Sequence, residues 1–513
     1  MRRPRPLVAL VTAAVTACAV LASPTARAQA PALDGFDAYV AQAVRDWGVP
    51  GLAIAVVKDG EVVFAKGYGV RRLGSPEAVD DRTLFAIGST TKAMTAAALG
   101  MLVDEGKLAW DDPVTKHLPW FVLNDPWVTR AITVRDMLTH RAGLPGTDAL
   151  WYEQRGTTRE IIDRLRLVPP QTSMRSHFTY QNVMYAAAGE IVAAVSGMPW
   201  RQFVTARLFE PLGMSATIST AATLGRQPNV AAPHATIGGA VAVIRNASVD
   251  NVAPAGAVWS NVRDMAQWLK MLLGGGTVAA GADGPTPRRL LSDAVLAELF
   301  TPQTTVGPDD FYPTARLTKP HWTTYGLGWF QADYAGEKVD FHTGSIDGMV
   351  AIAGLIRDQG LGVYVLANLD GAELRHALMY KTFDLYLRRP VRDWSTELRV
   401  LYQGLAKEAD ARQKKVDAER VSGTTPTRAL DRYAGTYTSP LFGVVTVSER
   451  AGQLHARYGE GFVGALEHWH YDTFKATWEA AWRGTALVTF QIDQRGSVAS
   501  VSLPQGVFVR TEK

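Results

Sequence analysis

The spacing of apolar residues predicts a helix followed by a β-hairpin at the start of the globular part of the chain. Apolar side chains recur at helical spacing over residues 33–47, which is typical of an amphipathic helix. Residues 52–57 and 62–68 are rich in β-branched side chains, and Asp59-Gly60 lies between them. Because glycine tolerates the positive φ of a tight turn, these two runs predict a β-hairpin.

Helical spacing dominates the middle of the chain. It recurs over residues 158–167, 183–196, 200–208, 260–273, 293–300 and 372–387. A second pair of β-rich runs, 349–356 and 361–367, flanks Asp358-Gln359-Gly360 and predicts another hairpin. Hairpins at both ends of one region, with helices between them, predict an α+β fold in which an antiparallel sheet is flanked by helices.

The pattern changes after residue 390. Residues 393–421 are charged and helical in spacing, as expected of a solvated connecting helix, and 422–427 has the composition of a linker. Short β-rich runs then follow one another to the C-terminus, which predicts a small antiparallel barrel or sandwich. The expected organisation is a signal peptide 1–28, a large α+β domain 29–390, a helical linker 391–427 and a β domain 428–513.

The N-terminal segment has the features of an export signal. Arg2, Arg3 and Arg5 precede an apolar run over residues 7–22, and Ala26-Arg27-Ala28 resembles a cleavage site. The run is too short and too rich in alanine for a convincing membrane span. We therefore expect an exported protein, periplasmic or secreted, with no stable membrane span after processing.

Cysteine and charge content narrow the function classes. Cys18 is the one cysteine of the chain, so a product cleaved after Ala28 has neither a disulfide nor a thiol. Val15-Thr16-Ala17-Cys18 also resembles a lipoprotein box, which leaves lipidation at Cys18 as an alternative. The formal charge of +4 is due to the arginines of the signal, and a neutral mature protein has no electrostatic basis for binding nucleic acid.

The segment Phe85–Thr95 carries the first candidate for chemistry. An alanine-rich helical pattern follows it, so Ser89 lies at a helix N-terminus with Lys92 three residues later on the same face. Burial and the helix dipole both disfavour a charged lysine there, which allows Lys92 to act as a base toward the Ser89 hydroxyl. An S-x-x-K sequence alone is also common in ordinary helices that begin with a serine cap.

Two later segments supply further motifs, which together with S-x-x-K are more specific than S-x-x-K alone. Tyr180-Gln181-Asn182 precedes a predicted helix and gives Y-x-N, and His342-Thr343-Gly344, on an apparent edge strand, gives H-T-G. S-x-x-K, Y-x-N and [K/H]-T-G in this order resemble the serine β-lactamase and penicillin-binding-protein superfamily. The Y-x-N form is similar to the branch, peptidase family S12, that holds class C β-lactamases, DD-peptidases, D-aminopeptidases and family VIII esterases.

The resemblance covers roughly residues 35–390 and includes three flanking segments, 138–145, 254–260 and 325–329. It implies a β-lactamase/transpeptidase-like fold for this region. The C-terminal residues 428–513 resemble the lipocalin-like β domain that is appended to some of these hydrolases.

The resemblance also implies a role for each residue of the first two motifs. Ser89 would be the acylated nucleophile and Lys92 its base. Tyr180 would move the proton to the leaving group, with its phenol pKa lowered by Lys92. Asn182 would orient Lys92 and the substrate amide.

The third motif would bind substrate through Thr343, Gly344 and the following Ser345. The backbone N–H groups of Ser89 and Ser345 would form an oxyanion hole. His342 stands where class C β-lactamases carry lysine, and it would offer only a partial positive charge at neutral pH. Binding of a substrate carboxylate should therefore weaken as pH rises. The H-T-G form also resembles D,D-peptidases, D-aminopeptidases and related peptidases more than dedicated β-lactamases.

Other catalytic classes have weaker support. His468 and His470 lie on one predicted strand face, but no third and fourth zinc ligand accompanies them, so we expect no metal and no cofactor. His140 is interpreted as a structural hydrogen-bonding residue. The chain contains neither a G-x-S-x-G nor an H-E-x-x-H sequence.

The sequence therefore predicts an exported serine hydrolase that forms an acyl-enzyme on Ser89 and cleaves peptide or amide bonds of small or D-residue-containing peptides. A carboxylesterase or weak β-lactamase with the same chemistry is one alternative. A penicillin-binding sensor that deacylates slowly is an alternative of another class. The expected partner is a small-molecule or peptide substrate, and the oligomeric state, a homo-oligomer included, is left open.

Overall fold

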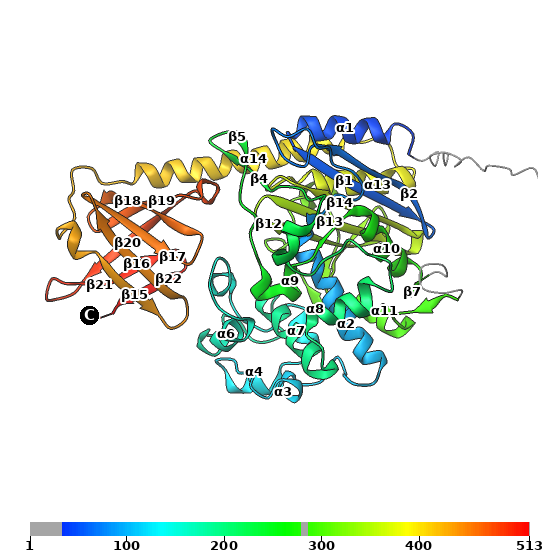
Figure 1. Ribbon diagram of the computed structural model, residues 1–513, viewed down its shortest axis with the longest axis horizontal. Coiled ribbons are helices and arrows are strands. Elements are labelled where there is room, and N and C mark those ends of the chain that lie inside the picture. The colour runs from blue at the N-terminus through cyan, green and yellow to red at the C-terminus, as the bar shows by residue number, and fades with distance from the viewer. Residues whose placement is uncertain (1–32, 279–285, 512–513) are drawn as a thin grey trace, which may run out of the picture.

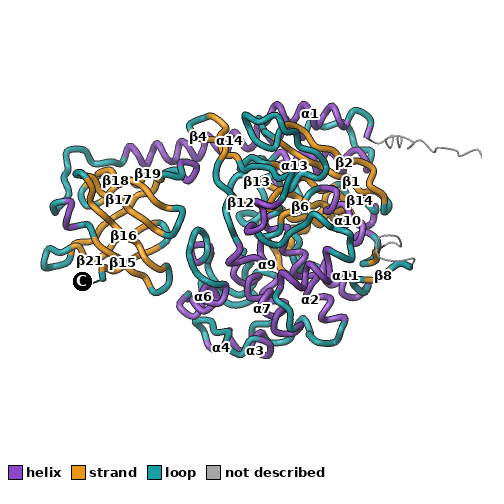
Figure 2. The backbone as a smooth tube through the Cα atoms, viewed as in Figure 1, coloured by secondary structure: helices purple, strands orange, loops and turns teal. Residues whose placement is uncertain are grey.

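The computed structural model describes residues 33–278 and 286–511, which form two bodies joined by a long helix (Figure 1). The expected signal peptide, 1–28, lies outside the described residues. The larger body combines a sheet with helices, and the smaller one is a β-barrel beside it (Figure 2). Within the described ranges, none of the helices combines the length and apolar character needed to cross a bilayer.

The larger body is built on an eight-stranded antiparallel sheet. Its strands in spatial order are β2 (Glu61–Gly69), β1 (Gly51–Lys58), β14 (Leu361–Ala367), β13 (Met349–Ile356), β12 (Glu337–Ile346), β11 (Phe330–Tyr334), β10 (Thr323–Tyr325) and β9 (Thr304–Thr305). Both predicted hairpins, β1–β2 and β13–β14, are confirmed. Because Leu52 of β1 pairs with Ala367 of β14, the sheet joins the N- and C-terminal parts of the region, as expected.

Helices cover both faces of the sheet. Successive residues of β1 point to opposite sides, so that Ala53 belongs to one hydrophobic core and Ile54 to the other. Helix α10 (Val262–Leu273) packs against β1 and β14 on the first side. Helix α13 (Leu374–Tyr386) packs against β13 and β14 on the second side, next to α1 (Phe36–Asp46).

A helical region lies beneath the sheet in Figure 1, around the buried helix α2 (Thr91–Asp104). Helix α2 contacts α7 (Asn182–Ser196), α9 (Ala253–Gly256) and α11 (Asp293–Leu299). The other helices of this body are α3 (Val114–His117), α4 (Pro126–Ala131), α5 (Val134–Leu138), α6 (Thr158–Asp163), α8 (Trp200–Val204) and α12 (Ala315–Thr318). Three two-stranded ribbons pair β3 (Phe85–Ala86) with β6 (Trp259–Ser260), β4 (His234–Ile237) with β5 (Ala240–Val243), and β7 (Thr277–Val278) with β8 (Arg288–Arg289).

Helix α14 (Trp394–Ala418) leads from the larger body to a closed eight-stranded barrel. The barrel strands are β15 (Gly435–Ser439), β16 (Gly443–Arg450), β17 (Gln453–Tyr458), β18 (Phe462–His470), β19 (Thr473–Trp478), β20 (Thr485–Ile492), β21 (Val498–Leu503) and β22 (Gly506–Arg510). Since β15 pairs with β22, the predicted β domain is a barrel rather than a sandwich. Its core is rich in aromatic side chains, among them Tyr433, Tyr437 and Phe490.

The expectation that the H-T-G segment lies on an edge strand is wrong. The segment belongs to β12, which has β13 on one side and β11 on the other. Strands β9, β10 and β11 are two, three and five residues long, too short for a clear two-residue alternation in the sequence. They extend the sheet beyond β12 and bring Tyr325 and Phe330 next to the motif.

Candidate active site

The S-x-x-K segment forms a 3₁₀ turn, Gly88–Thr90, that continues directly into α2. One further turn of helix places Lys92 beneath Ser89, with Lys92 Nζ 3.1 Å from Ser89 Oγ. Thr90 Oγ1 lies 2.6 Å from the hydroxyl of Tyr364 on β14. The nucleophile therefore stands at the junction of the helical region and the sheet.

Lys92 is buried, and its amine faces three acceptors. Besides Ser89 Oγ, Nζ donates to Asn182 Oδ1 at 2.6 Å and to Ala255 O at 3.0 Å. Burial lowers the pKa of Lys92 to about 7, and the Asp148 carboxylate acts in the opposite direction. A substantial fraction of Lys92 is therefore uncharged at neutral pH, and the neutral amine can accept the Ser89 proton.

The Y-x-N segment reaches the same point from α7. Asn182 is the first residue of that helix, and while its Oδ1 binds Lys92, its Nδ2 donates to Asp148 Oδ1 at 2.9 Å. The motifs do not identify Asp148, because nothing in the sequence links its loop to the site. The structure thus connects Asp148, Asn182, Lys92 and Ser89 in one hydrogen-bonded path.

Tyr180 lies beside Lys92, whose Nζ is 4.6 Å from the centroid of the phenol ring. Burial raises the pKa of Tyr180 well above its ordinary value, and a hydrogen bond with Ser89 offsets only part of this effect. The expectation that Lys92 lowers the pKa of Tyr180 below its ordinary value is wrong, because desolvation of the buried phenol dominates. Tyr180 stays protonated at neutral pH and can donate a proton.

The H-T-G segment brings β12 against the turn that carries the nucleophile. A Cβ on Gly344 would collide with Ile87 O and lie 3.0 Å from Ser89 N. A Cβ on Gly88 would lie 2.6 Å from Ser345 N. Glycine at both positions lets the two backbones touch. The amides of Ser89 and Ser345 consequently lie close together, as two donors to one oxyanion must.

Arg375 of α13 holds the end of β12 in place. Its Nη1 donates to Gly344 O at 2.6 Å and to Ser345 Oγ at 2.9 Å, and its Nη2 pairs with Glu373 Oε1 at 2.7 Å. The Arg375 side chain is only 5% exposed, so its charge is directed at Glu373 and the strand rather than at a substrate. Sequence reasoning missed this residue, since Arg375 lies in an ordinary helical pattern.

His342 is almost completely buried, and its ring centroid lies 6.2 Å from that of Tyr180. Its Nδ1 is 2.6 Å from Thr343 O, which can only accept, and its Nε2 is 3.0 Å from the Tyr325 hydroxyl. Burial, together with the nearby Lys92, lowers the pKa of His342 to about 3. The expectation of a partial positive charge at neutral pH is therefore wrong, because desolvation disfavours the imidazolium.

His140 positions the Y-x-N segment. Its Nδ1 accepts the Gln181 N–H at 3.0 Å, and the Thr179 N–H donates to its carbonyl at 2.8 Å. The imidazole centroid is 4.4 Å from that of Tyr180. Burial lowers the pKa of His140 well below its ordinary value, so a neutral ring packs against the phenol. This arrangement agrees with the structural role expected for His140.

A cavity of about 330 Å³ opens beside Ser89. Thr343 and Ser345 lie at its reacting end, and Asp309 and Asp310 stand exposed at its rim. Its walls are aromatic or apolar and consist of Phe178, Tyr180, Phe311, Tyr312, Pro313 and Phe330. Among the described residues, no lysine or arginine lines this cavity. It therefore offers an apolar surface with a negative rim.

The two histidines considered as zinc ligands have other partners. His468 Nε2 lies 2.9 Å from Tyr471 O, and His470 Nδ1 accepts the Val421 N–H at 3.2 Å. Across residues 33–278 and 286–511, no three His, Cys, Asp or Glu side chains are grouped so that they could hold a metal ion.

Comparisons with known proteins agree with the family that the three motifs resemble. A family model described as beta-lactamase matches residues 36–384, and one described as a domain of unknown function (DUF3471) matches residues 419–512. The relative named unguisins hydrolase ungD, from Aspergillus violaceofuscus, is 30% identical over 493 residues, which cover 87% of this chain and 83% of its own.

Solved structures share the fold. The octameric penicillin-binding protein homologue from Pyrococcus abyssi has a TM-score of 0.59 and 23% identity, over 93% of this chain and 100% of its own. A D-stereospecific amidohydrolase from Streptomyces sp. has a TM-score of 0.53 and 24% identity, over 68% of this chain and 97% of its own.

Proposed function

The chain belongs to the beta-lactamase family, and we propose that it is a serine hydrolase that forms an acyl-enzyme on Ser89 and cleaves amide bonds of small or D-residue-containing peptides. The observation that carries this proposal is the 3.1 Å contact between Ser89 Oγ and Lys92 Nζ. Because the pKa of Lys92 is lowered to about 7, this contact joins a nucleophile to a base that is available at neutral pH.

Acylation begins when neutral Lys92 takes the Ser89 proton and Oγ attacks the carbonyl carbon of the substrate. The negative charge that develops on the carbonyl oxygen is stabilised by the N–H groups of Ser89 and Ser345. Removal of one such donor typically costs about 3 kcal/mol of transition-state stabilisation. The rigid contact between β12 and the Ser89 turn, together with the clamp from Arg375, holds this geometry before substrate binds.

The leaving amine needs a proton before the C–N bond breaks, and Tyr180 is the donor. Its raised pKa keeps the phenol protonated, and the proton that it gives up is replaced by the one on Lys92. In deacylation a water molecule attacks the ester carbonyl, its proton passes to the same pair, and Ser89 Oγ recovers a proton. The enzyme returns to its starting state with no net change in protons.

The cavity favours a neutral or cationic substrate over one that is recognised through a carboxylate. Neither His342, which is neutral, nor Arg375, which is paired with Glu373, offers a free cation to the substrate. The carboxylates of Asp309 and Asp310 repel an anion at the rim. The name of the Streptomyces protein, a D-stereospecific amidohydrolase, favours an amide substrate, and the Aspergillus relative is also named a hydrolase.

Ester hydrolysis is the second candidate, because the same residues acylate with an ester and an alkoxide leaves without help. The missing cation argues against efficient β-lactam hydrolysis. A slowly deacylating sensor has the same acylation chemistry and differs only in the lifetime of the adduct.

A substrate panel tests the proposal. Wild type and Tyr180→Phe are assayed with a D-alanyl p-nitroanilide, a p-nitrophenyl ester and a fluorescent penicillin, with Tyr471→Phe on the exposed barrel surface as the matched control. We expect Tyr180→Phe to lower kcat for the amide by about 10²- to 10⁴-fold, the usual contribution of general acid catalysis, and to lower kcat for the ester far less. Equal losses on both substrates, or turnover of the ester alone, would contradict the amide assignment.

A further inference from the structure

One buried arginine of the barrel reaches into the larger body. Arg483 lies in a 3₁₀ turn, Ala481–Arg483, between β19 and β20, and its side chain is 3% exposed. The guanidinium lies 5.0 Å from the ring centroid of Tyr152 in the larger body and 4.9 Å from that of Phe462 in the barrel. Such a buried cation between aromatic rings needs nearby carboxylates to offset its desolvation.

Two carboxylates of the larger body provide this charge. Arg483 Nη2 is 2.6 Å from Glu153 Oε1 and 3.0 Å from Asp347 Oδ2. Asp347 also accepts from Trp482 Nε1 at 3.0 Å and from the Tyr152 hydroxyl at 2.6 Å. All three acidic and basic side chains are at most 12% exposed, so this is a buried charge cluster rather than a surface ion pair.

The two carboxylates belong to the two segments that complete the catalytic site. Asp347 lies in the β12–β13 turn, two residues after Ser345, whose N–H is the second donor of the proposed oxyanion hole. Glu153 lies in the loop between α5 and α6, five residues after Asp148, which binds Asn182. Arg483 thus joins both segments to each other and to the barrel.

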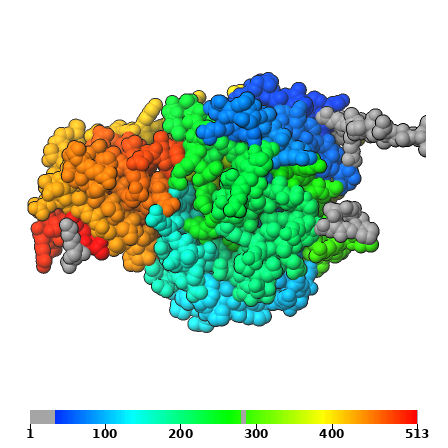
Figure 3. Space-filling model, in the orientation of Figure 1, coloured from blue at the N-terminus to red at the C-terminus, as the bar shows by residue number. Residues whose placement is uncertain are grey.

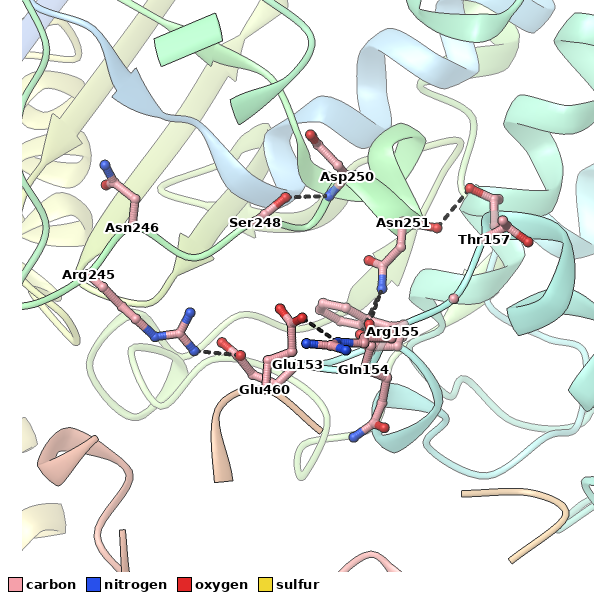
Figure 4. Close-up of a pocket in the computed structure, with 13 residues that line it drawn as sticks. Glu153, Gln154, Arg155, Thr157, Arg245, Asn246, Ser248, Asp250, Asn251 and Glu460 are labelled. Atoms are coloured by element: carbon pink, nitrogen blue, oxygen red, sulfur yellow. Dashed lines mark hydrogen bonds and ion pairs between the residues drawn. The ribbon is translucent and has the colours of Figure 1, made fainter. Parts of the chain in front are cut away.

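The loop that carries Asp148 and Glu153 depends on such contacts for its shape. Glu153 has φ 57°, a left-handed conformation that residues other than glycine rarely adopt. On the side of Arg155 and Arg245 the loop borders a cavity of about 620 Å³, across which Glu153 pairs with Arg245 at 2.5 Å (Figure 4). Glu460 of the β17–β18 turn lines the same cavity, and its N–H donates to Glu153 O at 2.9 Å.

We propose that Arg483 is a positioning residue of the active site and that the barrel, through it, fixes the loops of Asp148 and Ser345 in their catalytic arrangement. The barrel is then a working part of the hydrolase rather than an appended binding module. This inference rests on the proposed function, since it assigns Arg483 to the reaction at Ser89. The space-filling view shows the barrel in contact with the larger body (Figure 3).

The test compares Arg483→Ala with Arg155→Ala in the full-length mature protein. Arg155 also crosses to the barrel, through Glu460 at 2.6 Å, but it is 84% exposed and serves as the matched control. We expect Arg483→Ala to lower kcat for the amide by about ten- to a hundredfold with little change in KM, because catalytic groups misplaced by about 1 Å lose activity on this scale. Arg155→Ala should stay within about twofold of wild type, as expected of an exposed pair.

Gly461→Ala gives a second variant that removes no charge. Its Cβ would meet Glu153 Cδ at 2.6 Å and displace the carboxylate that pairs with Arg483, so it should lower kcat in the same direction even if Arg483→Ala does not fold. Circular dichroism and thermal unfolding establish that each variant is folded. Activity of both variants equal to that of Arg155→Ala would overturn the inference, whereas a wild type that never forms an acyl-enzyme would overturn the proposed function instead.

The pH profile separates positioning from a general loss of stability. The groups that face Lys92 are Ser89, Asn182, Tyr180, Tyr185, the neutral His140 and His342, the Ala255 carbonyl and, through Asn182, Asp148. Among the described residues in this set, Asp148 alone is charged at neutral pH, and it raises the pKa of Lys92. If Arg483→Ala lets the loop move away, the acidic midpoint of kcat/KM shifts to lower pH; a drop in activity with an unmoved midpoint would contradict displacement of Asp148.

Discussion

At the residue scale, burial shifts the two acid–base groups of the site in opposite directions. It lowers the pKa of Lys92 to about 7 and raises the pKa of Tyr180 well above its ordinary value. Since the neutral form of each group is the one that burial favours, the site holds an uncharged base next to an uncharged acid. This is the pair that attack by Ser89 and departure of an amine require.

The pH dependence of activity follows from these shifts. Below about pH 7 Lys92 is protonated and cannot act as a base, so kcat/KM for the amide should rise with pH to a plateau, with its midpoint near 7. Tyr180 stays protonated throughout this range, so no fall is expected from its titration. Asp148→Asn should move the midpoint to lower pH because the Asp148 carboxylate raises the pKa of Lys92, whereas Asp493→Asn in the barrel should not. Activity that appears only above about pH 9 would point to a phenolate base instead.

The charge of the side chain at position 342 determines whether the site can bind a substrate carboxylate. Because the imidazole of His342 is neutral, His342→Lys should speed acylation by a fluorescent penicillin by at least about tenfold, since a hydrogen bond to a charged group is worth about 1.5 kcal/mol or more. His342→Gln keeps the side chain polar and uncharged and serves as the control. Equal acylation rates in the two variants would show that the absent cation does not limit β-lactam recognition.

At the element scale, the site depends on the close approach of β12 to the 3₁₀ turn before α2. Gly344→Ala places a methyl group against Ile87 O, so we expect it to separate the two strands of backbone and to lower the free energy of unfolding by about 1–3 kcal/mol. Gly404→Ala, in α14 with no atom within 4 Å of the new Cβ, should instead raise it by up to about 1 kcal/mol. Denaturant unfolding measures both, and a stable, fully active Gly344→Ala protein would contradict the proposed oxyanion geometry.

The same scale shows what apolar spacing can predict. The hairpins β1–β2 and β13–β14 and the longer helices have enough residues for a period to appear, and they lie where the sequence places them. Strands β9 to β11 are too short, so the position of β12 inside the sheet is visible only in the structure. That position buries His342 beneath Tyr325 and Phe330 and determines its charge.

At the scale of the whole molecule, the catalytic motifs could be found from the sequence, but the residues that hold them in position could not. Ser89, Lys92, Tyr180 and Asn182 belong to short patterns with a known chemistry, and the structure brings them together. Asp148, Arg375 and Arg483 belong to no recognisable sequence motif, because each reaches the site through tertiary contacts from a distant segment. The last of these comes from the barrel, whose part in the site no single motif indicates.

The export signal also belongs to this scale, and we propose that the working protein lacks residues 1–28. Protein recovered after secretion from a bacterial host should begin at Gln29, as N-terminal mass spectrometry of the purified chain would show. A lipidated N-terminus at Cys18 would support the lipoprotein alternative, and a chain that retains Met1 outside the cell would contradict processing.

Intact-mass spectrometry of wild type and Ser89→Ala, each incubated with the D-alanyl p-nitroanilide, the p-nitrophenyl ester and the fluorescent penicillin, tests the acyl-enzyme most directly. We expect a transient mass increase equal to the acyl group on wild type, accompanied by turnover, and no adduct on the Ser89→Ala protein. An adduct that persists for hours on wild type would indicate the sensor rather than the hydrolase. Identical masses and identical turnover for the two proteins would show that Ser89 is only a helix residue and would contradict the mechanism at its starting point.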